Sequence, residues 1–317
     1  MKRENNIYIY IKYIVIIMSK VQHLKYNILE KNLTSSDGSV DTSAAKLKAE
    51  AAASGRSELE AKNPLLFSKT PTTEWECRVQ LAAAYRLADM YGWTEGIGNH
   101  FTCRVPENPD HFLINRFGEG FGEVTASSLV KIDHEGNIVD ENHTDAAINL
   151  AGFVIHSCVH HARDDCFAVF HTHETNVTAV SNMKCGLLPL NQTALLNGQI
   201  AYHDYEGVAV NDTERVTLGK DLADKSIMIL RNHGVLTTGS SIAEGFTRLF
   251  YVTKAAEIQV KTMGVHQNTE HMIFPRTQVQ KLVKEEQGFD GGATALSEAT
   301  FQMWMRKLDR FNPGYDK

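Results

Sequence analysis

Two histidines with metal-binding potential follow a short apolar run. His171 and His173 end the run 166–170, Cys-Phe-Ala-Val-Phe, which is too short for a helix and predicts a buried strand. Side chains two residues apart on a strand lie on the same face of its sheet. This pair can therefore offer two imidazoles side by side to one divalent ion.

A third imidazole follows a second apolar strand. His233 comes just after residues 227–230 and directly before Gly234, a residue type that permits a tight bend. If the two strands neighbour each other in one sheet, all three histidines meet at its carboxyl edge, where sites in α/β proteins form. Three histidines with an open fourth position are typical of catalytic zinc sites. We therefore predict one Zn²⁺, or another divalent ion, per subunit.

Other histidines compete for this interpretation. His156 and His160 are four residues apart on a predicted helix, a spacing that zinc sites use. No Glu or Cys completes that set, which favours a role in helix packing or at the surface. His100 and His203, expected in loops, are candidates to line the same cleft as the predicted metal site.

The surrounding sequence predicts an α/β domain. Apolar residues at helical spacing predict helices over 73–92, 146–162, 241–264 and 295–308. Thr73 and Ser241 are each followed three residues later by Glu, which is the capping-box pattern. Short apolar runs between turn residues predict strands at 101–105, 112–115, 129–132, 166–171 and 226–230. Strands interleaved with helices are typical of a layered α/β fold.

Composition limits the classes of protein and of partner. The 317 residues are 43% hydrophobic and 22% charged, which is typical of a globular protein. A formal net charge of −6 argues against a nucleic-acid partner. The apolar run at 7–18 is shorter than the ~20 residues of a membrane-spanning helix, so no membrane partner is expected. Five cysteines with no CxxC pair indicate reduced, mostly buried thiols in a cytoplasmic protein.

The chain divides into three predicted segments. Residues 1–72 form an N-terminal tail that we expect to be flexible and largely disordered, because 33–62 contains few large apolar side chains. Residues 73–264 form the α/β domain. Residues 265–317 form a C-terminal helical extension.

Several motifs, in order along the chain, resemble the class II aldolase/adducin family. Residues 98–102, Gly-Asn-His-Phe-Thr, resemble its G-N-x-S loop, and 129–133 resemble one of its strands. Residues 170–173, Phe-His-Thr-His, resemble its H-x-H motif, and 233–234 its later H-G. The resemblance covers about 74–264, and its strength lies in the order and spacing of the whole set.

The resemblance implies a layered α/β/α domain around a central mixed sheet. It also implies a homo-oligomer, usually a tetramer with sites at subunit interfaces. His171, His173 and His233 match the zinc ligands of the sugar-phosphate aldolases. Three further residues match substrate-binding loops: Gly98, Asn99 and Gly118.

The sequence departs from the aldolase pattern where the acid, the base and the phosphate cradle belong. The resemblance places the catalytic Glu of the aldolases at Gly152 and their acid Tyr near Gln192. It places the phosphate-binding Ser pair at 150–151, here Leu-Ala, and the Thr-Gly phosphate loop at 117–118, here Phe-Gly. The predicted metal ligands are thus kept while the groups for proton transfer and phosphate binding are changed.

The first functional hypothesis is a metal-dependent aldolase or lyase-like enzyme. Its substrate would be a small, non-phosphorylated carbonyl or hydroxy compound, on which the metal acts as a Lewis acid. Replacement acid–base groups would come from the cleft, and the candidates are Glu174, Tyr202, His203, Asp204, Glu206, Glu123 and Glu119. Strand alternation would point Glu174 away from the metal site, and 202–206 can also be a solvated turn.

The second hypothesis is a non-catalytic module that resembles the adducin head. Such a module forms oligomers and associates with the actin and spectrin cytoskeleton. Adducins lack the aldolase chemistry, and their heads are expected to lose metal histidines that are present in this chain. Their basic, lysine-rich tail engages the cytoskeleton, and residues 312–317 do not resemble it.

Overall fold

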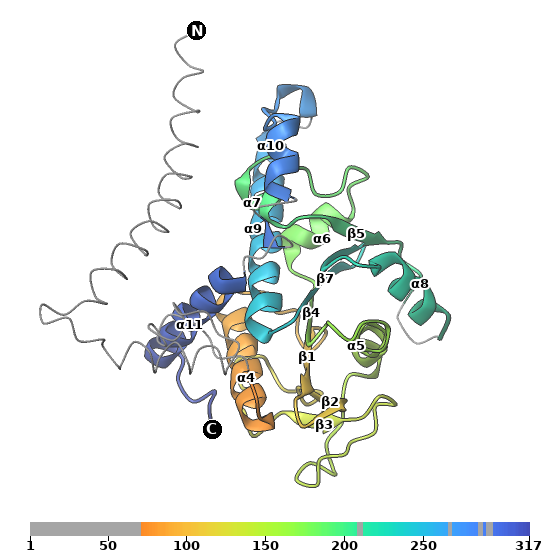
Figure 1. The fold of residues 1–317 in the computed structure, drawn as a ribbon, viewed down its shortest axis with the longest axis vertical. Helices are drawn as coiled ribbons and strands as arrows, with labels where there is room; N and C mark the ends of the chain where they lie inside the picture. The colour runs from red at the N-terminus through yellow and green to blue at the C-terminus, as the bar shows by residue number, and fades with distance from the viewer. Residues whose placement is uncertain (1–70, 208–211, 266–267, 285–287, 290–293) are drawn as a thin grey trace, which may run out of the picture. The chain divides into compact units, whose positions relative to one another are not determined.

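A seven-stranded mixed sheet lies at the centre of the fold (Figure 1). Its spatial order is β3–β2–β1–β4–β7–β6–β5. The strands are β1 (His100–Val105), β2 (Asn108–Ile114), β3 (Val130–Ile132), β4 (Ala168–Thr172), β5 (Ile200–His203), β6 (Ile227–Leu230) and β7 (Gly234–Gly239). Strands β5 and β6 are parallel, and the other described neighbours are antiparallel, which confirms the predicted mixed sheet.

The structure is a computed structural model. It describes residues 71–317 apart from 208–211, 266–267, 285–287 and 290–293. The predicted disorder of the N-terminal tail falls on residues 1–72 and lies almost wholly outside the described residues. No helix in the described part of the chain is both long enough and apolar enough to cross a bilayer.

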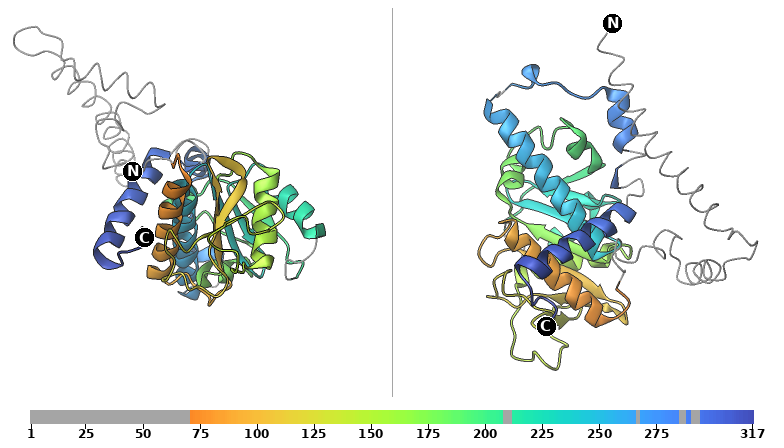
Figure 2. Two further views of the ribbon diagram at one scale, coloured as in Figure 1. Left: turned by 90° about the horizontal axis from the view of Figure 1, so that it is seen from below. Right: turned by 90° about the vertical axis from the view of Figure 1, so that its left-hand side faces the viewer.

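Helices cover both faces of the sheet, which confirms the layered α/β/α architecture (Figure 2, left). One face carries α4 (Glu74–Met90), α6 (Thr175–Ser181), α9 (Ile242–Val265) and α11 (Thr294–Phe311). The other face carries α5 (Leu150–Ala162) and α8 (Asp212–Leu222). The remaining short helices are α7 (Gln192–Leu196), α10 (Thr277–Leu282) and a 3-10 turn at Thr269–His271.

Alternate residues of β4 serve the two faces. Phe170 belongs to a hydrophobic core that includes Phe246 of α9. Val169 belongs to a second core that includes Val159 of α5. Because side chains alternate along a strand, His171 lies on the α5 face with Val169.

The predicted helix caps are present. The Thr73 side chain accepts a hydrogen bond from the backbone N–H of Glu76 at 3.2 Å, and Ser241 accepts one from Glu244 at 3.1 Å. The helix predicted from residue 146 begins only at Leu150, because the side chain of Asn149 caps it there.

The sequence did not reveal β5 or β7. Strand β7 lies between β4 and β6, so the two strands that precede the histidine motifs are not neighbours. Glycines at both ends and two threonines make β7 less apolar than the other central strands. The expectation that the two strands are neighbours is therefore wrong. Both run antiparallel to β7, so their carboxyl ends still lie at the same edge of the sheet, as expected.

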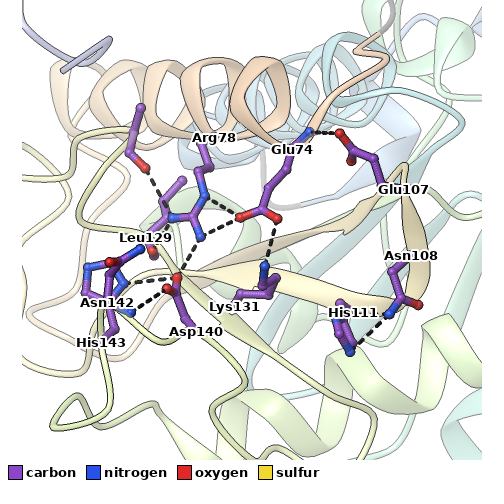
Figure 3. A network of polar contacts seen from close by, with 11 residues as sticks. Glu74, Arg78, Glu107, Asn108, His111, Leu129, Lys131, Asp140, Asn142 and His143 are labelled. Carbon is purple, nitrogen blue, oxygen red and sulfur yellow. Dashed lines mark hydrogen bonds and ion pairs between the residues drawn. The ribbon is translucent and has the colours of Figure 1, made fainter.

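A partly buried ion-pair network holds the loop after β3 against helix α4 (Figure 3). Arg78 donates to Asp140 at 2.6 Å and to Glu74 at 2.8 Å, and Lys131 donates to Glu74 at 2.9 Å. The Nδ1 atom of His143 lies 3.0 Å from the Asp140 carboxylate. Burial alone would raise the pKa of Asp140, but the contacts from His143 and Arg78 outweigh it and lower the pKa to about 2.

Candidate metal centre

Three imidazoles converge at one end of the sheet. His171, His173 and His233 each offer a ring nitrogen, and these nitrogens lie within 4.8 Å of one another. The Nε2 atoms of His171 and His173 are 2.9 Å apart. His171 is buried and the other two are partly buried, so the set is open on one side. The structure thus brings together the three histidines that the sequence singled out, in an arrangement that can hold a metal ion.

The backbone around β7 positions the third histidine. His233 lies in the turn from β6 to β7, where Asn232 adopts a positive φ of 56°. We expected Gly234 to permit this bend, but its φ is not positive, so the left-handed conformation in the turn belongs to Asn232 instead. A Cβ at position 234 would lie 2.4 Å from the carbonyl oxygen of Thr172. Gly234 is therefore required by the close approach of β7 to the end of β4, which carries His173.

Hydrogen bonds fix which ring nitrogens carry lone pairs. Nδ1 of His171 lies 3.0 Å from the carbonyl oxygen of Val235, which can only accept, so this nitrogen carries the proton. Nδ1 of His173 contacts the Glu95 carboxylate and is the donor there for the same reason. Both Nε2 atoms are then unprotonated, and two lone pairs face each other across 2.9 Å. A cation between them removes this repulsion, so the residues fit a divalent metal.

The site favours neutral imidazoles, the form that binds metals. Burial, followed by the charges of His100 and His233, lowers the pKa of His171 well below its ordinary value. Burial, followed by His173, lowers the pKa of His233 to about 4. Near neutral pH His171 and His233 are therefore neutral and can each offer a lone pair to a metal ion.

Two of the three predicted substrate-binding residues lie next to His173. The Asn99 side chain accepts from the backbone N–H of His173 at 3.0 Å and donates to the carbonyl of Trp93 at 2.9 Å. A Cβ at Gly98 would lie 3.7 Å from the His173 ring. The third, Gly118, lies in an exposed loop with a φ of 90°. Direct substrate contact by these residues stays a prediction.

A cavity of about 570 Å³ opens onto the three histidines. Its other lining residues include Glu95, His100, Gly152, Thr175 and Tyr205. Glu95 is the one ionised side chain among the described lining residues, and its carboxylate contacts His173. The cavity therefore joins the candidate metal ligands to a weakly charged space of small-molecule size.

The acid–base candidates occupy varied positions. Glu174 caps helix α6 by accepting from the backbone N–H of Val177 at 2.9 Å. The Tyr202 hydroxyl accepts from the N–H of Leu187 at 3.0 Å, away from the cavity. Glu123 accepts from Gly120 within its own loop at 2.8 Å. These groups already have structural partners.

The rest of the polar run reaches the neighbourhood of the site. His203 and Asp204 line a narrow crevice beside His233, and Nδ1 of His203 contacts Asp221 at 2.8 Å. Glu206 is exposed. Tyr205, in the same candidate run 202–206, lines the cavity with its ring 6.1 Å from that of His233. Its only signal in the sequence was its place among other polar residues.

The structure also shows where the positions that depart from the aldolase pattern lie. Leu150 and Phe117 are 66% and 52% exposed, so the places of the expected phosphate ligands carry solvent-facing apolar groups. Gln192 begins helix α7. Gly152 faces His100 across the cavity wall, and a Cβ there would lie 2.1 Å from the His100 ring. No side chain fits at position 152 while that ring is in place.

The competing histidines have a packing role. His156 and His160 are each 1% exposed and hydrogen-bond to Thr102 of β1, at 2.6 and 2.8 Å. The packing interpretation of this pair is confirmed, and a surface position is excluded. His100, expected in a loop, is the first residue of β1 and does line the cavity.

Sequence comparison finds relatives among both aldolases and adducins. The family model for the Class II Aldolase and Adducin N-terminal domain matches residues 79–260. A Caulobacter vibrioides protein, provisionally named as an aldolase class 2 protein, is 43% identical over 251 residues, 79% of this chain and 95% of its own length. Alpha-adducin of Rattus norvegicus is 41% identical over 246 residues, 75% of this chain, but the match spans only 33% of that adducin.

Two solved structures share the fold closely. An aldolase II superfamily protein from Pseudomonas syringae aligns with a TM-score of 0.73 and 43% identity, over 78% of this chain and 98% of that one. L-fuculose 1-phosphate aldolase from Glaciozyma antarctica aligns with a TM-score of 0.68 and 25% identity, over the same shares of the two chains, 78% and 98%.

Proposed function

Because the chain belongs to the class II aldolase and adducin N-terminal domain family, we propose that it is a divalent-metal-dependent, lyase-like enzyme. Its substrate is a small, non-phosphorylated carbonyl or hydroxy compound. The observation that carries this proposal is the pair of Nε2 lone pairs of His171 and His173, 2.9 Å apart with His233 beside them. A divalent ion held there supplies Lewis-acid polarisation of a substrate oxygen.

The proposed roles follow from the contacts of each residue. His171, His173 and His233 bind the ion, and Zn²⁺ is the metal that three neutral imidazoles with an open position suit best. Glu95 orients the His173 ring through its Nδ1–H. Tyr205 is 53% exposed at the cavity wall, and its hydroxyl is our candidate for moving a proton to or from substrate.

The substrate carries no phosphate under this proposal. Leu150 and Phe117 offer no hydrogen-bond donor from their side chains, and no Lys or Arg occurs among the described residues that line the cavity. A phosphate group carries nearly two charges and needs several donors. The zinc-loaded protein should therefore cleave L-fuculose 1-phosphate poorly, although a protein of similar fold is an aldolase for that compound. Cleavage at a rate typical of enzymes would refute the substrate assignment.

We also propose a cytoplasmic homo-oligomer, a tetramer by family resemblance. Four of the five free cysteines are buried, which suits a reducing compartment. Ile97 and Leu150 are exposed apolar side chains, 43% and 66%, on segments next to the cavity, and a subunit contact would cover them.

The alternative is a non-catalytic module like the adducin head, associated with the actin and spectrin cytoskeleton. The 41% identity to alpha-adducin over 246 residues favours it. A module of this kind needs no metal, so the metal content of the protein separates the two proposals.

The test is the zinc content of the purified protein after zinc loading and dialysis, measured by mass spectrometry. We expect one zinc per chain in the wild type and a large loss in His171→Ala, with a parallel fall in melting temperature because the ion binds only the folded state. His161→Ala is the matched control, since His161 is an exposed histidine at the end of α5, and it should keep its zinc. A zinc-free wild type would favour the adducin-like alternative. Stoichiometric zinc after all three ligands are replaced would refute the site.

A further inference from the structure

A chain of hydrogen bonds runs from the cavity into the protein behind the metal centre. Nδ1 of His100 lies 2.9 Å from Nε2 of His156. Nδ1 of His156 lies 2.6 Å from the Thr102 hydroxyl, which lies 2.8 Å from Nε2 of His160. Nδ1 of His160 ends the chain at the carbonyl oxygen of Cys166, at 3.1 Å.

The carbonyl at its inner end sets the direction of every bond in this chain. A carbonyl only accepts, so Nδ1 of His160 is the donor and its Nε2 is an acceptor. The Thr102 hydroxyl gives its single hydrogen to that Nε2 and must accept from Nδ1 of His156. Nε2 of His156 is then left to accept from Nδ1–H of His100. The last atom, Nε2 of His100, therefore carries a lone pair.

His100 presents this lone pair beside the metal centre. It pairs with His171 across the antiparallel strands β1 and β4, so both rings lie on the same face, with centroids 5.0 Å apart. Its Nε2 would lie 2.2 Å from a Cβ at position 152. By family resemblance that position is the place of a carboxylate, so here a neutral acceptor from β1 occupies the space of a charged one from α5.

The replacement of a carboxylate at position 152 by the neutral ring of His100 changes the net charge around the metal centre. The three metal-binding imidazoles are neutral, and so is the His100 ring. Glu95, the one carboxylate among the described lining residues, contacts Nδ1 of His173. A divalent ion in a set of neutral donors keeps its full positive charge and favours an anionic ligand. With no Lys or Arg among the described lining residues, a singly charged carboxylate suits this site better than a phosphate.

We propose that the site takes a small hydroxycarboxylate, whose carboxylate lies at the three-histidine centre while its hydroxyl donates a hydrogen bond to Nε2 of His100. This assignment rests on the proposed metal-dependent function and specifies its substrate class. His100 is in this sense a specificity-determining residue, because its lone pair distinguishes a ligand that carries a hydroxyl from one that does not.

The test compares glycolate with acetate, which differ by one hydroxyl group. Full-length protein loaded with Zn²⁺ is titrated with each anion by calorimetry. The ratio of the acetate dissociation constant to the glycolate dissociation constant should be about three- to tenfold larger in the wild type than in His100→Phe. Only the wild type can accept a hydrogen bond from the glycolate hydroxyl at residue 100. The ratio is taken within each protein and per bound zinc, so a change in zinc affinity in His100→Phe does not enter it.

A second measurement needs no variant. Nitrogen-15 NMR of the histidine side chains in the wild type should show Nδ1 of His100 protonated and its Nε2 bare. Glycolate, but not acetate, should shift the Nε2 signal in the direction of hydrogen bonding.

The outcomes separate this inference from the proposed function. If the wild type binds no zinc, the proposed function fails and this inference fails with it. If zinc binds stoichiometrically but His100→Phe keeps the full preference for glycolate, or His100 carries its proton on Nε2, only the assignment of His100 and of the hydroxycarboxylate is overturned.

Discussion

Replacement of Gly152 by alanine should destabilise the protein, although alanine is the better helix former. The added Cβ would lie 2.1, 2.2 and 2.7 Å from three atoms of the His100 ring. Ordinary contacts at such a Cβ are 3.4 Å or longer, so the ring would have to move by more than 1 Å. His100 is only 2% exposed and lies between the rings of His156 and His171. Such a movement breaks its hydrogen bond to His156.

The magnitude is a balance of three contributions. Overpacking a buried site costs about 1–3 kcal/mol. A buried hydrogen bond lost at His156 adds about 1–3 kcal/mol. The preference of the helix for alanine returns about 0.5–1 kcal/mol. The net loss is about 1–5 kcal/mol with a midpoint of about 3 kcal/mol, and for a domain of this size the midpoint lowers the melting temperature by roughly 10 °C.

The assay is chemical denaturation of the zinc-free protein, with a double-mutant cycle. Gly264→Ala is the matched control, because Gly264 is also helical and a Cβ there would have nothing within 4 Å. This control should be neutral or slightly stabilising. In a His100→Ala background the clash is gone, so Gly152→Ala should also be neutral or stabilising. A stable Gly152→Ala single variant would refute the placement of the His100 ring against α5, and with it the argument that His100 replaces a side chain at 152.

Three further predictions concern other parts of the chain. Glu95→Gln should weaken zinc binding about 10- to 100-fold, measured by competition with a chelating dye, because the charged acceptor of the His173 Nδ1–H is lost; unchanged affinity would contradict this role. Acid should remove the contribution of Asp140, whose folded-state pKa of about 2 lies below its unfolded value of about 3.9. That contribution is up to about 2–3 kcal/mol; it is complete above about pH 5 and is lost as the pH falls toward 2. The difference in unfolding free energy between wild type and Asp140→Asn should therefore narrow in acid. A difference that stays constant would count against the ion-pair network. Removal of residues 1–62 should leave melting temperature and zinc content unchanged, because 33–62 has too few large apolar side chains to offset an ordering entropy of about 1–2 kcal/mol per residue; precipitation or zinc loss would disprove it.

The parts of the site that depend on local periodicity could be predicted from the sequence. The convergence of His171, in β4, with His173, one residue past its end, follows from the period of two, and the caps at Thr73 and Ser241 follow from short-range hydrogen bonds. The layered fold follows from strands that alternate with helices.

The parts that depend on register across strands could not be predicted. The pairing of His100 with His171 joins residues 71 positions apart, and no local pattern specifies which residue of β1 faces which residue of β4. The insertion of β7 between β4 and β6 was hidden because this strand is rich in Gly and Thr. Tyr205 reaches the cavity through a loop, whose conformation has no periodic signal.

Positions 100 and 152 show how this fold can exchange one acceptor for another without moving a metal ligand. Strand β1 and helix α5 face the same small space, and the 2.1 Å separation means that it holds either the ring of residue 100 or a side chain of residue 152. A carboxylate from the helix compensates one charge of a bound divalent ion, whereas the imidazole from the strand compensates none. The imidazole still offers a lone pair, since the chain of donors that ends at the Cys166 carbonyl keeps its Nε2 unprotonated. The exchange therefore leaves the centre more positive and still able to accept a hydrogen bond, a combination that selects an anion bearing a hydroxyl group.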